Sequence, residues 1–171
     1  MHSSHHNPTS NSSAGDGAMS AGLSSDPARV CDIVSERVFA APRERLFRAF
    51  SEPVQLARWW GPADFTNEFY EFDLRPGGRW RFAMHGPDGA RYEQDREFVD
   101  VVAPERIVLD NPDPVHRFRM TMTFATHGEG TLLKWRMSFE SASEFARVKD
   151  IIAAANEQNF DRLEVLLATL T

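Results

Sequence analysis

The sequence has little of what marks several large classes of protein. It holds one cysteine, Cys31, in 171 residues, which excludes an internal disulfide and fits a reducing cytoplasm. No run of apolar residues is long enough for a membrane-spanning helix. Lys and Arg number 19 against 25 Asp and Glu, so a basic nucleic-acid groove is not expected. These shortages predict a cytoplasmic protein that binds neither nucleic acid nor membrane.

Clusters that would carry chemistry are missing as well. No set of nucleophile, His and acid is recognisable, and no spacing suits metal ligands. We therefore predict no catalytic residue, no metal and no cofactor. The acidic row Glu93, Asp95 and Glu97 is expected to face arginines on a neighbouring strand, forming an exposed lattice of charges instead of a carboxylate or cation site.

The first 28 residues differ in composition from the rest. Residues 1–28 contain no aromatic residue, no Lys and no Arg, and consist mostly of Ser, Gly, Asn, Ala and His. Such a segment buries too little apolar surface to offset its ordering entropy, and it lacks the apolar core of a secretory signal. We predict a disordered leader or an expression-tag remnant over 1–28, and one domain over 29–171.

The most informative stretch spans residues 70–98 and contains the string FDLRPGGRWRFAMHGPDG over 72–89. Each glycine-rich cluster separates runs that alternate apolar and polar residues at period two, which predicts three antiparallel strands joined by two tight turns. Aromatic side chains then share one face, and charges of alternating sign share the other.

Turn geometry predicts a register for these strands. A turn centred on Pro87 places Phe82 opposite Tyr92 and Trp80 opposite Gln94. The preceding turn places Tyr70 near Phe82. Both turns predict the same buried face.

Two polar residues are predicted to lie on that buried face. Gln94 and Arg96 share the phase of Tyr92 and Phe98, provided that no bulge intervenes. An apolar wall with a few polar groups is typical of a ligand pocket, because such groups are costly to bury without partners. Alternatively, Arg96 reaches an open edge, or a bulge redirects it.

Two short helices are expected between the first strand and the rest of the sheet. Residues 29–40 alternate loosely as a strand, and 42–51 have Pro first and apolar residues at helical spacing. A second short helix ends at the Gly-Pro pair that follows Trp59 and Trp60. Either both tryptophans pack in the core, or one of them reaches the rim of a cavity.

A second hairpin is predicted over residues 118–139. Its alternating apolar residues place Met122 opposite Trp135 and Met120 opposite Met137. A wall rich in methionine suits a cavity of adaptable shape, and it suits a loosely specified core equally well.

The longest predicted helix runs from Ser143 to Leu170. Its apolar stripe is small or polar in the middle, at Ala155 and Asn159, and bulky at the C-terminal end. Laid across a curved sheet, such a helix would close firmly at one end and leave room halfway along.

Five strings carry a family resemblance: APRERLFRAFSEP, ARWWGP, FDLRPGGRWRFAMHGPDG, VAPERIV and NEQNFDRLEVLLA. Over about residues 30–170 the chain resembles the helix-grip domains called SRPBCC or START-like. Within them it is similar to the branch related to the C-terminal domain of activators of the ninety-kilodalton heat-shock chaperone's ATPase. The resemblance implies an α+β fold, with a curved antiparallel sheet of about six or seven strands wrapped around a long C-terminal helix and a hydrophobic cavity between them.

The resemblance also suggests functions, because members of this superfamily bind hydrophobic compounds and some cyclise polyketides. We predict binding of a small hydrophobic, aromatic molecule. The alternatives are an aromatase or cyclase-like enzyme, in which Arg96 or Tyr92 would polarise a carbonyl, and a module with a chaperone as protein partner. The predicted ligand-binding residues are Trp60, Tyr70, Trp80, Phe82, Tyr92, Gln94, Arg96, Phe98, Met120, Met122, Trp135, Ile152, Ala155 and Asn159.

Overall fold

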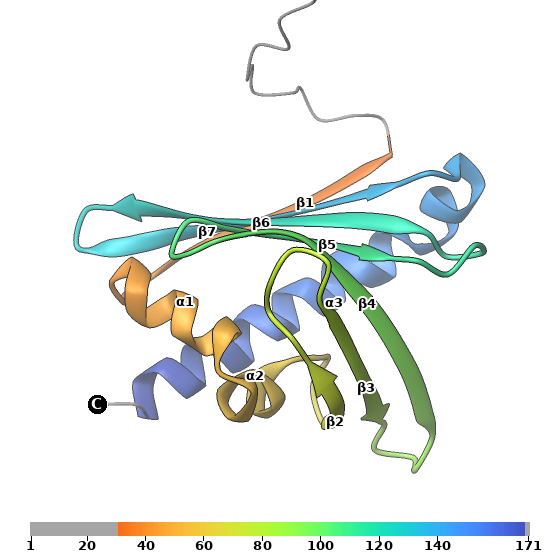
Figure 1. Cartoon of the computed structure of the whole chain (residues 1–171), viewed down its shortest axis with the longest axis horizontal. Helices are drawn as coiled ribbons and strands as arrows, with labels where there is room; N and C mark the ends of the chain where they lie inside the picture. The colour runs from red at the N-terminus through yellow and green to blue at the C-terminus, as the bar shows by residue number, and fades with distance from the viewer. Residues whose placement is uncertain (1–30, 170–171) are drawn as a thin grey trace, which may run out of the picture.

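A curved antiparallel sheet with three helices on one side forms the domain (Figure 1). The computed structural model describes residues 31–169, so the predicted leader over 1–28 lies outside the described residues. The elements are β1 (Asp32–Phe39), α1 (Arg43–Ser51), α2 (Pro53–Trp59), β2 (Thr66–Phe72), β3 (Arg79–His85), β4 (Arg91–Val102), β5 (Arg106–Asn111), β6 (Phe118–His127), β7 (Gly130–Phe139) and α3 (Ala142–Thr169). The predicted helix-grip architecture is confirmed.

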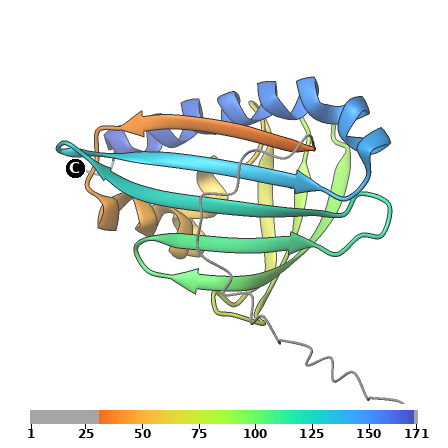
Figure 2. The ribbon, with the colours of Figure 1, turned by 90° about the horizontal axis from the view of Figure 1, so that it is seen from above.

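The strand order is β1-β7-β6-β5-β4-β3-β2, and every neighbouring pair is antiparallel. The β2–β3–β4 portion bends away from the other strands toward the side on which the helices lie (Figure 1). Seen from above, α3 runs alongside β1, at the opposite edge of the sheet from β2 (Figure 2). The sheet therefore curls around the helices, and its inner face carries the core.

The second hairpin follows the predicted register. Met122 lies opposite Trp135 and Met120 opposite Met137, because strict alternation and a two-residue turn leave no other pairing that buries these side chains. In β7 every second residue is buried, and these residues are Thr131, Leu133, Trp135, Met137 and Phe139. This face forms the floor of the core.

The register predicted between β3 and β4 is wrong by two residues. Phe82 lies opposite Gln94 and Trp80 opposite Arg96. The turn is centred later than expected because the Asp88 side chain accepts the N–H of Ala90 at 3.0 Å, so the turn spans residues 86–90. A slip of two residues keeps every side chain on its face, and the predicted buried face of β3 is therefore confirmed.

A β-bulge in β2 corrects a second pairing. The register shifts between Phe69 and Glu71, so Phe69, and not Tyr70, lies opposite Phe82. The Phe69 ring packs against Trp80 and Phe82, with centroids 5.4 and 5.7 Å away. Tyr70 is thereby turned outward, where its hydroxyl contacts Arg91, and it is 44% exposed.

Helix α3 has fully buried side chains in its C-terminal half alone. Its buried residues are Asn156, Asn159, Phe160, Leu163, Leu166 and Leu167. Between Ala142 and Ala155 no side chain is fully buried; Phe145, Val148 and Ile152 are half-buried against the core. The free energy that holds the helix on the sheet therefore comes mostly from its second half.

Candidate functional site

The interior between the sheet and the helices is filled by the chain's own aromatic side chains. Six of the predicted ligand-binding residues are buried there, namely Trp80, Phe82, Phe98, Met120, Met122 and Trp135. Trp60 covers them, with its ring centroid 5.0 Å from that of Trp80 and 5.3 Å from that of Trp135. The space left beside Trp60 and Trp80 measures about 10 Å³, which holds at most one water molecule. The predicted hydrophobic cavity is not confirmed at this place.

Four other predicted residues lie outside this interior. Tyr70 and Tyr92 are 44% and 47% exposed, so neither aromatic ring belongs to the core. Ile152 and Ala155 are half-buried on α3, just before the half of the helix that has fully buried side chains. Tyr92 therefore lacks the enclosed position that a group polarising a substrate carbonyl would need.

Asn159 has a structural role at the turn after α2. Its Oδ1 accepts the N–H of Gly61 at 2.7 Å, and its Nδ2 donates to the carbonyl of Ala155 at 3.0 Å. Gly61 has a φ of 101°, a conformation that other residues rarely adopt, so the contact fixes a turn that depends on glycine. Both ends of the amide are engaged within the protein.

Arg162, one turn further along α3, binds the same turn after α2. The sequence did not indicate this role. Its two terminal nitrogens donate to five backbone carbonyls at 3.0–3.1 Å, those of Arg58, Trp60, Gly61, Pro62 and Phe65. Burial lowers the pKa of Arg162. The guanidinium thus clamps the segment that carries Trp60 and fixes the Trp60 ring where it covers the filled interior.

Open space lies elsewhere, beside the part of β4 that extends beyond β5. β4 pairs with β5 from Glu97 onward, whereas residues 91–96 pair with β3 alone. The β5–β6 loop departs at the same point, and the gap between loop and strand is a cleft of about 630 Å³. Its lining residues are Glu93, Gln94, Asp95, Arg96, Asn111, Pro112, Asp113, Pro114 and His116. Gln94 and Arg96 of the predicted set are therefore brought together here.

Arg96 is the half-buried arginine that lines this cleft. Its Nη1 donates to the carbonyl of Asp95 at 2.9 Å, and its Nη2 donates to Gln94 Oε1 at 2.7 Å. The guanidinium lies 5.3 Å from the ring centroid of Phe118. In the part of the chain that the structure describes, no carboxylate forms an ion pair with it. Burial lowers the pKa of Arg96 to about 10, although the nearby carboxylates of Asp95 and Asp113 act to raise it, and the group stays charged at neutral pH.

The carboxylates that line the cleft have partners of their own, but one oxygen, Asp95 Oδ1, is buried without a hydrogen-bond partner among the described residues. Asp95 is 2.6 Å from Arg79, and Glu93 is 2.6 Å from Arg91. Asp113 accepts two backbone N–H groups of its own loop at 2.8 and 3.4 Å, and these hydrogen bonds lower the pKa of Asp113. The charge of Arg96 is therefore not neutralised by a bonded neighbour.

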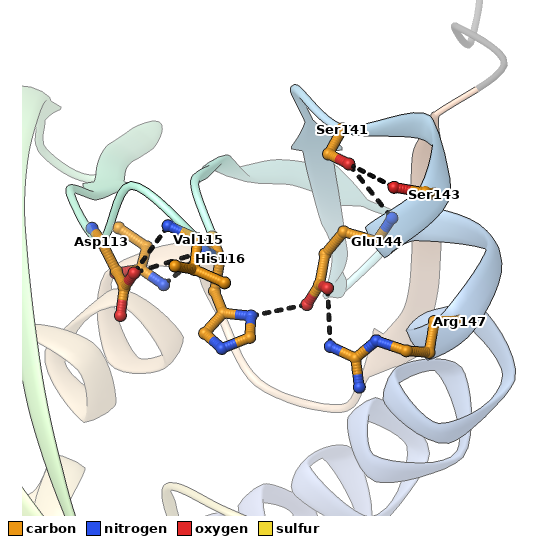
Figure 3. A network of polar contacts seen from close by, with 8 residues as sticks. Asp113, Val115, His116, Ser141, Ser143, Glu144 and Arg147 are labelled. Atoms are coloured by element: carbon orange, nitrogen blue, oxygen red, sulfur yellow. Dashed lines mark hydrogen bonds and ion pairs between the residues drawn. The ribbon is translucent and has the colours of Figure 1, made fainter.

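A polar network ties the β5–β6 loop to the start of α3 (Figure 3). His116 Nδ1 lies 2.7 Å from Glu144 Oε1, and Arg147 Nη2 donates to the other carboxylate oxygen at 2.6 Å. Ser141 Oγ accepts the N–H of Glu144 at 3.2 Å and caps the helix. The least anchored half of α3 is thus held to the rim of the cleft by polar contacts.

We expect this network to weaken in acid. The hydrogen bond from Arg147 first, and then that from His116, lower the pKa of Glu144 below the ordinary value of a glutamate side chain, about 4.5. The stability it contributes is present above that value and is lost as the pH falls through the folded pKa. Hydrogen exchange should show amides of the first turns of α3 losing protection below about pH 4.5. Glu144→Gln should show the low protection already at pH 7; unchanged protection in both proteins would contradict the prediction.

Arg96 should reduce the stability of the ligand-free protein. Arg96→Met is expected to raise the free energy of unfolding by about 1 kcal/mol, because a half-buried charge without a bonded counter-ion is removed. Arg81→Met, the same change at an exposed position on the neighbouring strand, should alter it by less than about 0.5 kcal/mol. Urea unfolding measures both values. A clear loss of stability in Arg96→Met would show that the stacking on Phe118 outweighs the cost of the charge.

The same fold occurs in solved bacterial structures. A Mycobacterium smegmatis protein is 29% identical with a TM-score of 0.71, covering 82% of this chain and 92% of its own. A Chromobacterium violaceum protein is 26% identical with a TM-score of 0.72, covering 80% and 96%. A Nitrosomonas europaea protein reaches a TM-score of 0.78 over 85% and 99% at 19% identity, a likeness that shows the fold alone. Comparison with curated proteins finds no match.

A sequence model of one family decides the classification. The family described as "Activator of Hsp90 ATPase homolog 1-like protein" matches residues 40–168. The chain belongs to this family. The resemblance expected from the five sequence strings is thereby confirmed, and the Activator of Hsp90 ATPase homolog 1-like family has a fold of the SRPBCC type, which commonly binds hydrophobic ligands.

The described residues include neither a membrane-spanning helix nor a metal-binding cluster. Within residues 31–169, no helix combines the length and the apolar character that crossing a membrane requires. The same residues contain no group of three or more His, Cys, Asp or Glu side chains that could hold a metal ion.

Proposed function

We propose that this member of the Activator of Hsp90 ATPase homolog 1-like family binds a small apolar organic molecule between its sheet and α3, at the end where the cleft opens. The observation that carries the proposal is the contrast between the filled interior, with about 10 Å³ of free space, and the cleft of about 630 Å³ at Arg96. Ligand pockets typically measure about 300–1,000 Å³.

An apolar path supports this location. The Phe118 ring, on which Arg96 stacks, lies 5.4 Å from the Phe139 ring, and Phe139 lies 6.2 Å from Phe145 on α3. Val148, one turn further along α3, is half-buried against the core. A row of aromatic contacts therefore leads from Arg96, which lines the cleft, to the first half of α3. No side chain of that half is fully buried, so it can shift at small cost to admit a ligand.

The uncharged fluorescent probe N-phenyl-1-naphthylamine tests the proposal. Its emission should rise and shift to shorter wavelength on binding, with micromolar affinity. Val148→Arg places a charge on the proposed apolar wall and should weaken binding at least tenfold. Ile151→Arg makes the same change at a position that is 71% exposed and should leave the affinity within twofold. Failure of the unmodified protein to bind the probe, or equal affinities in the two variants, would refute the proposal.

A further inference from the structure

We propose that the ligand is an organic acid, with its carboxylate or sulfonate bound by Arg96 and its apolar body on the Phe118 side of the cleft. This inference rests on the proposed function and adds the chemical class of the ligand. It is carried by a half-buried guanidinium that lines an open cleft and has no bonded counter-ion among residues 31–169.

Arg96 has more N–H donors than the protein uses. A guanidinium carries five N–H groups in a rigid fork that matches the two oxygens of a carboxylate. The structure records two hydrogen bonds from Arg96, both to β4 itself, at Asp95 and Gln94. These contacts and the ring of Phe118 fix the orientation of the fork without neutralising it. The arrangement is preorganised, so an acid need not first displace an internal salt bridge.

The neighbouring acids do not fill the place of the ligand. Asp95 is engaged by Arg79 on β3, and Glu93 is engaged by Arg91. Asp113, on the facing loop, is held by the backbone N–H groups of that loop. A purely structural arginine would normally pair with one of these groups, because an unpaired half-buried charge costs stability. An incoming anion would supply the directly bonded counter-ion that Arg96 lacks, since Asp95 and Asp113 act on it only at longer range.

The ligand needs an apolar body as well as a charge. One face of the Arg96 guanidinium lies against the half-buried Phe118 ring, and the centroid of the buried Phe139 ring lies 5.4 Å from that of Phe118. A bare inorganic anion would leave this surface unused. Alkyl and aromatic acids share the required chemistry, and the experiment separates them.

Two probes with a common ring system test the inference: 8-anilinonaphthalene-1-sulfonate, which is an anion, and N-phenyl-1-naphthylamine, which is neutral. Arg96→Gln should weaken the sulfonate at least tenfold and leave the neutral probe within twofold. Arg81→Gln removes an exposed positive charge on the neighbouring strand and should change neither affinity. Retained binding of the neutral probe also shows that Arg96→Gln is folded.

The outcomes separate the two proposals. If the unmodified protein binds neither probe, the proposed function fails and the inference fails with it. If it binds the neutral probe but Arg96→Gln leaves the affinity for the sulfonate unchanged, or weakens both probes equally, the inference alone is overturned.

Competition then identifies the source of the acid. Hexadecanoate, 2-naphthoate and inorganic phosphate are each titrated against bound 8-anilinonaphthalene-1-sulfonate. Displacement by hexadecanoate assigns an alkyl acid, and displacement by 2-naphthoate assigns an aromatic one; both support the inference. Displacement by phosphate at the same concentration, or by neither organic acid, would overturn it.

Discussion

Arg162→Ala is expected to lower the free energy of unfolding by about 3 kcal/mol. The substitution leaves five backbone carbonyls between Arg58 and Phe65 without their charged donor. Water can replace only some of these hydrogen bonds. Arg162→Lys should recover less than half of the loss, because an ammonium group cannot reach all five oxygens at once.

Urea unfolding monitored by circular dichroism measures this effect. Arg58→Ala is the matched control, since that arginine is exposed and precedes the clamped turn. The control should lose less than about 0.5 kcal/mol. Comparable losses in Arg58→Ala and Arg162→Ala would contradict the role of Arg162 as a clamp on the segment that carries Trp60.

Phe160→Ala should lower the free energy of unfolding by about 3–5 kcal/mol, which is the usual cost of truncating a fully buried aromatic side chain. Its ring packs edge-on against Trp135 at 4.8 Å and Phe39 at 5.8 Å, and Arg37 lies over it at 5.4 Å. These contacts fasten α3 to β1 and β7.

Phe145→Ala provides the contrast at the other end of the helix. Its ring is half-buried and its centroid lies 6.2 Å from that of Phe139, so its truncation should cost only about 1 kcal/mol. The same denaturant series measures both variants. Equal losses would show that α3 is anchored evenly along its length, which would remove the physical basis for a ligand entering beside its first half.

An ion cluster reinforces this asymmetry. Arg37 on β1 contacts Glu157, Asp161 and Glu164, at 2.8, 2.9 and 3.4 Å, all on the C-terminal half of α3. At the other end, Glu144 contacts Arg147 of the same helix and His116 of the β5–β6 loop, so this end of α3 is tied to a loop that lines the cleft. The two ends of one helix are thus held by different kinds of interaction.

The sequence predicted the architecture because its signals are local. Strict alternation and a two-residue turn determine the second hairpin, so the pairing of Met122 with Trp135 was correct. The faces of β3 were also correct, since they depend on parity alone. The exact β3–β4 register depends on an Asp88 side-chain contact within the turn, and the outward position of Tyr70 depends on a bulge; neither has a clear periodic signal.

The candidate site could be predicted only in part. Gln94 and Arg96 were identified because polar residues on an apolar phase are unusual. The opposite wall comes from Asn111, Asp113 and His116, whose proximity to β4 depends on how the β5–β6 loop folds back. The string NPDPVH over residues 111–116 is rich in proline and polar residues, which indicates a loop but does not show which strand the loop lies against.

The filling of the interior between the sheet and the helices could not be predicted, for a similar reason. The small residues of α3 near Ala155 indicated free space, but the sequence could not show that the Trp60 ring covers the interior. Its position depends on the clamp formed by Arg162 and on the turn at Gly61, both set by tertiary contacts.

The most direct test of this account is to titrate the ¹⁵N-labelled protein with 2-naphthoate and to follow the resonances by NMR. The account predicts the largest shifts at the side-chain N–H of Arg96 and at backbone amides of Asn111 and His116, which line the cleft. The same titration of Arg96→Gln should show none of these shifts at equal concentration. Shifts confined to Tyr70 and Tyr92, or shifts that persist in Arg96→Gln, would contradict it.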